Sequence, residues 1–441
     1  MKSLHLRAMI VSLLIIAIIA GLGLFTLRLG RDGRDWAEFT TNGNVYRSGR
    51  LRRGILTDRD GTELARITDG GIVYPEDPDL RRALVHITGD RSGSVAGGAF
   101  RLYRDEFVDY DIVNGVRDYV SGQGKTLALA VSAELNKAAL EALEGRRGTV
   151  SIADAETGEI LCRVSSPTFD PLGEEVPDGA YVDRFLAGSY VPGSVFKLVT
   201  LWAALENIPD IEDREFDCAG EITVHGAKIT CMAPHGQMKI DDALARSCNC
   251  VFASLALELG PGIMAEYAEK AGITQGFHID GAAVSRGRFD DYEPGSPALA
   301  WSGAGQSTVL VTPAAMLRFV TAIAADGTAP ELTERLGGTG NRQELMSTRT
   351  ARRIRDIMAY TARGYALDLP EGAAPFAKSG TAEVGGDARP HAWMVGFFTW
   401  EGRTYSFAVV VENGGFGSGT AGGVLEKTAA AMKKQKSGQE Q

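Results

Sequence analysis

The chain has 441 residues, of which 44% are hydrophobic and 23% charged, and its formal net charge is −10. This length exceeds one ordinary domain, and the composition is that of a folded rather than a disordered protein. The negative charge argues against a nucleic-acid partner, because neutralising phosphates requires a basic face.

An apolar run without charged residues covers residues 8–27. At about 1.5 Å per residue, its length as a helix matches a hydrocarbon core about 30 Å thick. The run is longer than the apolar region of a signal peptide, and no small-residue cleavage site follows it, so we expect an uncleaved membrane anchor. Lys2 and Arg7 precede the run, but Arg28 and Arg31 follow it, so the charge bias does not define the orientation.

A stalk and a small β-rich pedestal are expected over residues 28–124, with a strand–turn–strand pattern in RGILTDRDGTELA. The larger domain is expected over residues 125–432, followed by a polar tail at 433–441. Strands open this domain, helices fill its middle (residues 240–259 among them), and strands and a helix at 423–432 close it. This order predicts an α+β fold with one antiparallel sheet built from both ends of the domain.

The chain contains five cysteines, namely Cys162, Cys218, Cys231, Cys248 and Cys250. Cys218 and Cys231 flank a predicted β-hairpin that turns at His225, so a disulfide across the hairpin is one alternative. A zinc site that adds His225 and His235 is disfavoured, because the spacing C-x6-H-x5-C-x3-H does not match a tetrahedral knuckle. No H-E-x-x-H pattern occurs either, and we therefore expect no metal and no cofactor.

Two further patterns are set aside. The segment GSGTAG at residues 417–422 matches G-x-G-x-x-G, but no second parallel strand follows it to supply a ribose-binding acid. A Ser-His-Asp triad is unsupported, because the chain lacks a G-x-S-x-G elbow.

A serine and a lysine three residues apart carry the first chemical signal. Pro192 and Gly193 precede Ser194, and a proline before a helix places the serine in the first turn. Residues i and i+3 share a helix face, so Lys197 can accept a hydrogen bond from the Ser194 hydroxyl once burial has lowered its pKa. Ordinary composition gives roughly one S-x-x-K in a chain of this length, so the pattern alone is weak.

Two more patterns follow in order. Ser-Cys-Asn at residues 247–249 offers a hydroxyl and a carboxamide that can relay a proton and hold an amide, although polar clusters are common at helix ends. Lys-Ser-Gly-Thr at residues 378–381 lies on a predicted strand, where glycine allows close approach of a ligand and the lysine and hydroxyls suit a carboxylate.

In the order S-x-x-K, S-x-N, K-S-G, the three patterns resemble those of the penicillin-recognising serine enzymes. The flanking segments RGILTDRDGTELA, VSSPTFDP, HGQMKIDDALARSCN, GAGQSTVLVTP and HAWMVGFF are similar to segments of class B penicillin-binding proteins. The resemblance covers roughly residues 43–430, and the short pedestal is most similar to the small penicillin-binding protein A type. It implies a transpeptidase domain of the penicillin-binding and serine β-lactamase-like fold.

The family's activity implies a D,D-transpeptidase that cross-links peptidoglycan stem peptides. By resemblance, Ser194 attacks the D-Ala-D-Ala carbonyl and Lys197 takes its proton. Ser247 and Lys378 pass a proton to the leaving D-Ala, and Asn249 holds the peptide amide. β-Lactams would acylate the same serine.

The resemblance further implies that Ser379, Gly380 and Thr381 bind the substrate, with the two hydroxyls on its carboxylate. Backbone amides of Ser194 and Thr381 would form the oxyanion hole. Because the substrate lies outside the cytoplasmic membrane, residues 1–7 are expected in the cytoplasm and the catalytic domain on the outer side. The bilayer and a membrane peptidoglycan polymerase are the other expected partners.

Some alternatives remain. A D,D-carboxypeptidase would use the same residues with water as acceptor, and a scaffold or β-lactam sensor would need no turnover. Val195 stands where the family commonly has threonine, and residues 91–119 lack a clear match to the family's G-x-E segment.

Overall fold

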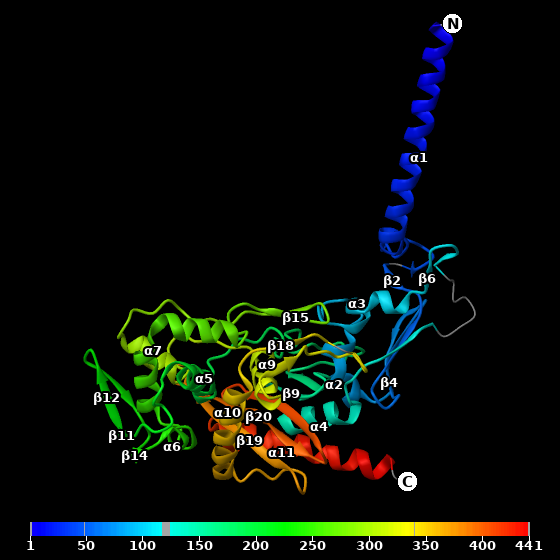
Figure 1. Ribbon diagram of the computed structural model, residues 1–441. Coiled ribbons are helices and arrows are strands. Elements are labelled where there is room, and N and C mark those ends of the chain that lie inside the picture. The colour runs from blue at the N-terminus through cyan, green and yellow to red at the C-terminus, as the bar shows by residue number, and fades with distance from the viewer. Residues whose placement is uncertain (1, 48, 117–123, 339, 440–441) are drawn as a thin grey trace.

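In the computed structural model, the chain is described over residues 2–47, 49–116, 124–338 and 340–439. Helix α1 (Lys2–Ala37) leads away from the rest of the molecule (Figure 1). Among the described residues, one helix is long and apolar enough to cross a membrane, over Leu4–Ala37, and its most apolar stretch packs against no other part of the chain. The helix indicates a single-pass membrane protein.

The membrane-proximal part is a small mixed region. A sheet in the order β5-β4-β3-β8 forms its centre, with antiparallel pairs except for β3 and β8, which run parallel. Asp58, in the turn after β3, accepts the backbone N–H groups of Asp60 and Thr62 at 2.9 and 2.8 Å. Helix α2 is the longest helix of this region, and the remaining elements are short. The bounds of the whole region are β1 (Tyr46–Arg47), β2 (Arg50–Leu51), β3 (Gly54–Thr57), β4 (Glu63–Thr68), β5 (Gly71–Val73), α2 (Pro78–Thr88), α3 (Ala99–Leu102), η1 (Arg104–Phe107), β6 (Tyr110–Asp111), β7 (Gly115–Val116) and β8 (Thr126–Ala128).

A five-stranded antiparallel sheet in the order β10-β9-β21-β20-β19 forms the centre of the larger region. Its strands come from both ends of that region, as the sequence predicts: β9 (Gly148–Asp154), β10 (Ile160–Ser166), β19 (Ala374–Ala382), β20 (His391–Trp400) and β21 (Arg403–Val411). All residues of β9 and β10 are buried, because helices cover both faces of the sheet. Strand β19 is left at one edge.

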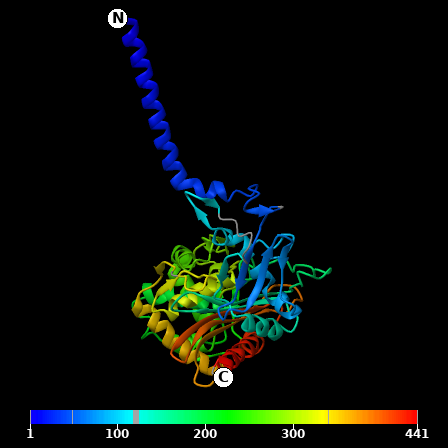
Figure 2. The same cartoon turned by 90° about the vertical axis from the view of Figure 1, so that its right-hand side faces the viewer.

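Helices α4 (Ala133–Leu143) and α11 (Gly417–Gln439) pack side by side on one face of the sheet (Figures 1 and 2). The last helix thus begins six residues before the predicted range, at the first glycine of GSGTAG. On the other face lie α5 (Lys197–Asn207), α9 (Pro313–Ala324) and α10 (Thr348–Ala362).

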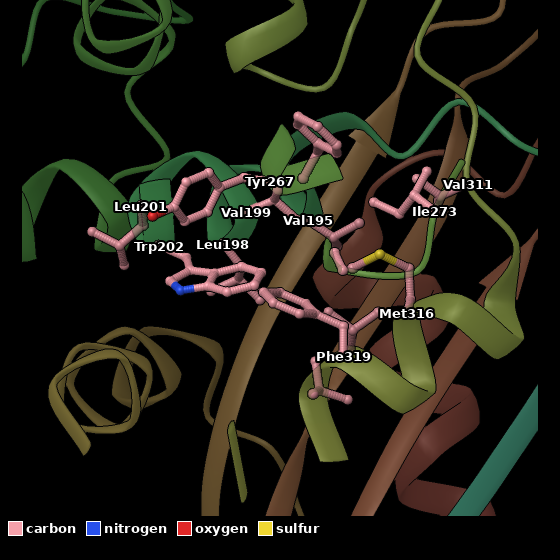
Figure 3. Packing of buried hydrophobic residues seen from close by; sticks show 14 of the residues in the cluster. Val195, Leu198, Val199, Leu201, Trp202, Tyr267, Ile273, Val311, Met316 and Phe319 are labelled. Atoms are coloured by element: carbon pink, nitrogen blue, oxygen red, sulfur yellow. The ribbon is translucent and has the colours of Figure 1, made fainter. Parts of the chain in front are cut away.

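The core of this helical side surrounds Trp202 (Figure 3), whose ring lies 4.8 Å from that of Tyr267 and 5.7 Å from that of Phe319. Val195 and Leu198 belong to the same cluster and are fully buried. The start of α5 is therefore held against a rigid, close-packed interior.

The single helix predicted over residues 240–259 is wrong. Helix α6 (Ile240–Ala245) ends before Ser247, whose φ of 53° interrupts the helical hydrogen-bond ladder. Helix α7 (Asn249–Lys270) begins after it, with Cys248 as its N-cap, and continues through a kink at Gly260. The remaining elements are η2 (Gly193–Val195), β11 (Phe216–Cys218), β12 (Glu221–Val224), β13 (Ala227–Thr230), β14 (Gly236–Met238), β15 (Phe277–Ile279), β16 (Ala282–Val284), α8 (Pro297–Gly303), β17 (Thr328–Pro330), β18 (Arg342–Glu344) and η3 (Arg363–Tyr365).

Candidate active site

Ser194 lies in the short 3-10 turn η2, just before α5, and is half-buried. The preceding Gly193 has a φ of 55°, and its N–H donates to the Gly305 carbonyl at 2.9 Å. A Cβ on Gly193 would lie 2.7 Å from the Thr381 carbonyl oxygen. Glycine is therefore required both for the conformation and for the close approach of this turn to β19.

Lys197, the first residue of α5, is fully buried beneath the turn. Its Nζ donates to the Ser247 carbonyl at 2.6 Å, to Asn249 Oδ1 at 2.7 Å and to Ser247 Oγ at 3.2 Å. The direct hydrogen bond predicted between Ser194 and Lys197 does not occur among the described residues. Because η2 is not a continuous part of α5, the lysine head points to the Ser-Cys-Asn segment, which offers it three oxygens.

Lys378, on β19, is the second fully buried lysine. Its Nζ donates to Ser247 Oγ at 3.1 Å, to the Ser379 carbonyl at 2.8 Å and to Tyr365 Oη at 3.4 Å. Tyr365 also accepts the backbone N–H of Ser379 at 3.1 Å. Sequence reasoning missed this tyrosine, since no motif surrounds it and only the fold brings η3 to β19.

Burial disfavours charge on both lysines. It lowers the pKa of Lys378 to about 7. Burial, and then the positive charge of Lys378, lower the pKa of Lys197 well below its usual value. Each buried ammonium therefore loses its proton more readily than an exposed lysine does, and the Ser247 hydroxyl lies between the two amines.

Residues 379–381 lie on the edge strand β19, where Ser379 pairs with Met394, Gly380 with Trp393 and Thr381 with Ala392. Because β20 occupies only one side, the outer backbone groups of β19 can pair with an extended ligand. A Cβ on Gly380 would lie 2.8 Å from the Pro192 carbonyl oxygen, so this glycine permits the contact with the serine turn.

The first glycine of GSGTAG has a packing role at this strand. Gly417, the first residue of α11, donates its N–H to Thr381 Oγ1 at 3.3 Å, and a Cβ on it would overlap the Gly380 carbonyl. Close packing of the helix start on β19 explains the first glycine of the pattern without a nucleotide.

The structure thus brings together the eight predicted residues. Hydrogen bonds connect Lys197, Ser247, Asn249, Lys378 and Ser379, while the serine turn packs on Gly380 and Thr381. Ser194 thus lies at the start of a helix, next to two buried lysines that share the Ser247 hydroxyl and next to an open edge strand. This arrangement is that of a serine acyltransferase of the penicillin-recognising class.

Comparison with known proteins agrees with this class. The family model described as penicillin binding protein transpeptidase domain matches residues 148–433, and the chain belongs to this family. The peptidoglycan D,D-transpeptidase PbpA of Mycolicibacterium smegmatis is 27% identical over 361 residues, which cover 70% of this chain and 72% of that protein. PbpA of Mycobacterium tuberculosis is 27% identical over 322 residues, which cover 63% of this chain and 64% of that protein.

Solved structures share the fold. The D,D-transpeptidase domain of a peptidoglycan glycosyltransferase from Eggerthella lenta has a TM-score of 0.73 at 25% identity, covering 88% of this chain and 99% of that one. The penicillin G acyl-enzyme complex of penicillin-binding protein A from M. tuberculosis has a TM-score of 0.73 at 23% identity, and the match covers 87% of this chain and 99% of that one. The predicted fold and the predicted resemblance to class B penicillin-binding proteins are confirmed.

Proposed function

We propose that this protein is a peptidoglycan D,D-transpeptidase in which Ser194 forms an acyl-enzyme with the D-Ala-D-Ala end of a stem peptide. The observation that carries this proposal is the position of Ser247, whose hydroxyl lies 3.2 Å from Lys197 Nζ and 3.1 Å from Lys378 Nζ. The names of the PbpA relatives support the same activity.

In the acylation step, Ser194 Oγ attacks the carbonyl carbon of the penultimate D-Ala. Its proton passes to the neutral amine of Lys197, whose lowered pKa makes it a base. The backbone N–H groups of Ser194 and Thr381 are the candidate donors to the oxyanion. Hydrogen bonds to Lys197 would tighten when substrate excludes water from the turn.

Collapse of the tetrahedral intermediate breaks the bond between the carbonyl carbon and the nitrogen of the terminal D-Ala. The leaving amine needs a proton, and we assign its delivery to the Ser247 hydroxyl, with Lys378 replacing the proton that Ser247 gives up. The Ser247 hydroxyl is already within hydrogen-bond distance of both lysine amines.

The substrate would lie along β19. The hydroxyls of Ser379 and Thr381 suit its terminal carboxylate, and Gly380 between them keeps the strand accessible. Asn249 is fixed by two contacts, its Oδ1 on Lys197 at 2.7 Å and its Nδ2 on the Thr230 carbonyl at 2.8 Å. This orientation suits an amide that holds the peptide bond of the donor stem.

An amine from a neighbouring stem would then resolve the acyl-enzyme and form the cross-link. Water in place of the amine would make the same residues a D,D-carboxypeptidase. Because the substrate is exported, we place residues 1–7 in the cytoplasm and the catalytic domain outside, with α1 in the bilayer. A membrane-bound peptidoglycan polymerase, which makes the strands to be joined, is the partner this location favours.

The test uses the full chain in detergent. Incubation with penicillin G should add one covalent adduct, seen by intact mass, and the Ser194→Ala variant should add none. Ser189→Ala changes an exposed serine nearby and should keep the adduct. A wild-type chain that is never acylated would sink the proposal.

Product analysis separates the two acceptors. On lipid-linked pentapeptide strands, cross-linked dimers identify a transpeptidase. Acylation by penicillin together with tetrapeptide monomers alone would instead identify a carboxypeptidase.

A further inference from the structure

Four side chains that can bind a metal come from four segments and meet at the Ser-Cys-Asn segment, which supplies one of them. Cys218 ends β11, Cys231 follows β13, His235 precedes β14, and Cys248 caps α7. One ligand atom from each residue lies within 4.8 Å of every other. Cys218 and Cys248 are buried, and the other two are half-buried.

These cysteines are not paired. The Sγ atoms of Cys218 and Cys231 are 3.8 Å apart, and all five cysteines of the chain are free thiols, so the disulfide considered from the sequence is not formed. The zinc site disfavoured there used His225, which instead lies in the turn between β12 and β13. Cys248, 17 residues beyond Cys231, replaces it and gives the spacing C-x12-C-x3-H-x12-C.

The separations fit a tetrahedral zinc ion. With Zn–S bonds of about 2.3 Å and Zn–N bonds of about 2.0 Å, two sulfurs lie about 3.8 Å apart, and a sulfur and a nitrogen about 3.5 Å apart. The observed values are 3.8 Å for Cys218 and Cys231, 3.7 Å for Cys231 and Cys248, and 3.5 Å from Cys218 Sγ to His235 Nδ1. The other distances between ligand atoms are at most 4.8 Å, so shifts of about 1 Å would bring them to the tetrahedral values.

Backbone donors also favour thiolate ligands at this place. The N–H of Cys250 points to Cys231 Sγ at 3.4 Å, and the N–H of Val251 to Cys248 Sγ at 3.5 Å. Both belong to the first turn of α7, where unpaired N–H groups and the helix dipole stabilise negative charge. Such outer hydrogen bonds are typical support for metal-bound sulfur.

We propose that Cys218, Cys231, His235 and Cys248 bind one Zn²⁺ in a closed tetrahedral site. Four protein ligands leave no open position, so the ion has a structural and not a chemical role. It would fix the β11–β14 segment to the start of α7. Ser247 and Asn249 flank the ligand Cys248, so the ion acts as a positioning device for the two residues that contact Lys197.

A disulfide is the competing use of these thiols. Cys250 Sγ lies 3.4 Å from Cys231 Sγ, so oxidation could join this pair and remove one ligand. Mass spectrometry distinguishes the two states on the same sample, because zinc binding adds the mass of the ion and disulfide formation removes two hydrogens.

The decisive measurement is the metal content of the full chain, purified in detergent with a phosphine reductant after growth with added zinc. We expect one zinc per chain by inductively coupled plasma mass spectrometry. Replacement by Co²⁺ should give the visible bands of a tetrahedral ion and thiolate-to-cobalt absorption in the near ultraviolet. Both readouts use the wild-type chain and so do not depend on how variants fold.

Variants then assign the ligands. Cys231→Ser and Cys248→Ser should lower zinc affinity at least tenfold, whereas Cys162→Ala and His225→Asn, which lie outside the cluster, should keep one zinc. Ser194→Ala should also keep it, so the site can fail or hold independently of the proposed function. A reduced wild-type chain that binds no zinc, zinc retained without Cys231 and Cys248, or a disulfide at Cys231 in zinc-replete protein would each overturn the proposal.

A kinetic readout tests the positioning role. Removal of zinc by a chelator should slow acylation by penicillin at least tenfold, and added zinc should restore it. An unchanged rate in the metal-free chain would overturn that role.

Discussion

Replacement of Lys378 by methionine should stabilise the fold near neutral pH while it abolishes acylation. The ammonium of Lys378 is fully buried, and burial lowers its pKa from 10.5 to about 7. Methionine has a similar length and no charge, so it can fill the same space without this desolvation.

The expected size follows from the linkage between protonation and folding. Holding the lysine pKa at about 7 disfavours the folded state by about 4 kcal/mol at pH 7, at about 1.4 kcal/mol per pH unit. Methionine leaves Ser247 Oγ, Tyr365 Oη and the Ser379 carbonyl without this donor, at a cost of about 1 kcal/mol each. The net gain for Lys378→Met is therefore about 1 kcal/mol at pH 7.

The sign of the stability difference between Lys378→Met and the wild-type chain depends on pH. Between about pH 7 and 10.5 the unfolded lysine binds more protons than the folded one, so the wild-type chain gains stability as the pH rises. The methionine variant has no such gain. Its advantage should be largest at or below pH 7 and should reverse at about pH 8, where the penalty on the wild-type chain falls below about 3 kcal/mol.

Thermal unfolding of both proteins in detergent, from pH 6 to pH 10, measures this difference. We expect Lys378→Met to melt about 2–4 °C higher at pH 7, with the gap lost and then reversed in alkali. Lys228→Met, a change of an exposed lysine, should show no such trend over this range. A variant that melts lower at every pH, or by an amount independent of pH, would refute the burial argument.

Two further outcomes concern acylation. Its rate should fall as the pH drops through the lowered pKa of Lys197, because a protonated amine cannot accept the serine proton; stopped-flow rates that show no fall with decreasing pH would contradict this. Gly193→Ala should reduce the rate more than tenfold, since its Cβ would lie 2.7 Å from the Thr381 carbonyl oxygen. Gly281→Ala also places alanine at a positive φ, of 90°, but in open space, and an equal loss of rate there would show that the contact with Thr381 is not the cause.

The sequence predicts the chemistry better than the contacts that organise it. The three motifs are local, and apolar residues bounded by turns identify β9 and β20 without help from the fold. Tyr365 belongs to the active site through its contact with Lys378, and Cys248 belongs to the proposed zinc site through its contact with Cys231. In both pairs the partner is more than ten residues away in the sequence. No spacing rule reveals such pairs, because the loops between them vary freely in length.

The break at Ser247 shows the same limit more sharply. The segment from residue 240 to 259 has neither glycine nor proline, so its apolar spacing predicts one uninterrupted helix. The structure places a left-handed residue at Ser247 instead, and its carbonyl, its hydroxyl and the Asn249 side chain all reach Lys197. Strain of this kind persists where the surrounding contacts hold it, and it is typical of functional sites.

In the proposed mechanism, the shared hydroxyl of Ser247 gives the two lysines different roles in successive steps. The charge of Lys378 lowers the pKa of Lys197, and this repulsion acts in both directions. When Lys197 takes the proton of Ser194, the second positive charge in the same buried site makes Lys378 a stronger acid. The hydroxyl between them is then the shortest route for a proton to the leaving amine. Acylation would thus prepare the acid that its own second half requires.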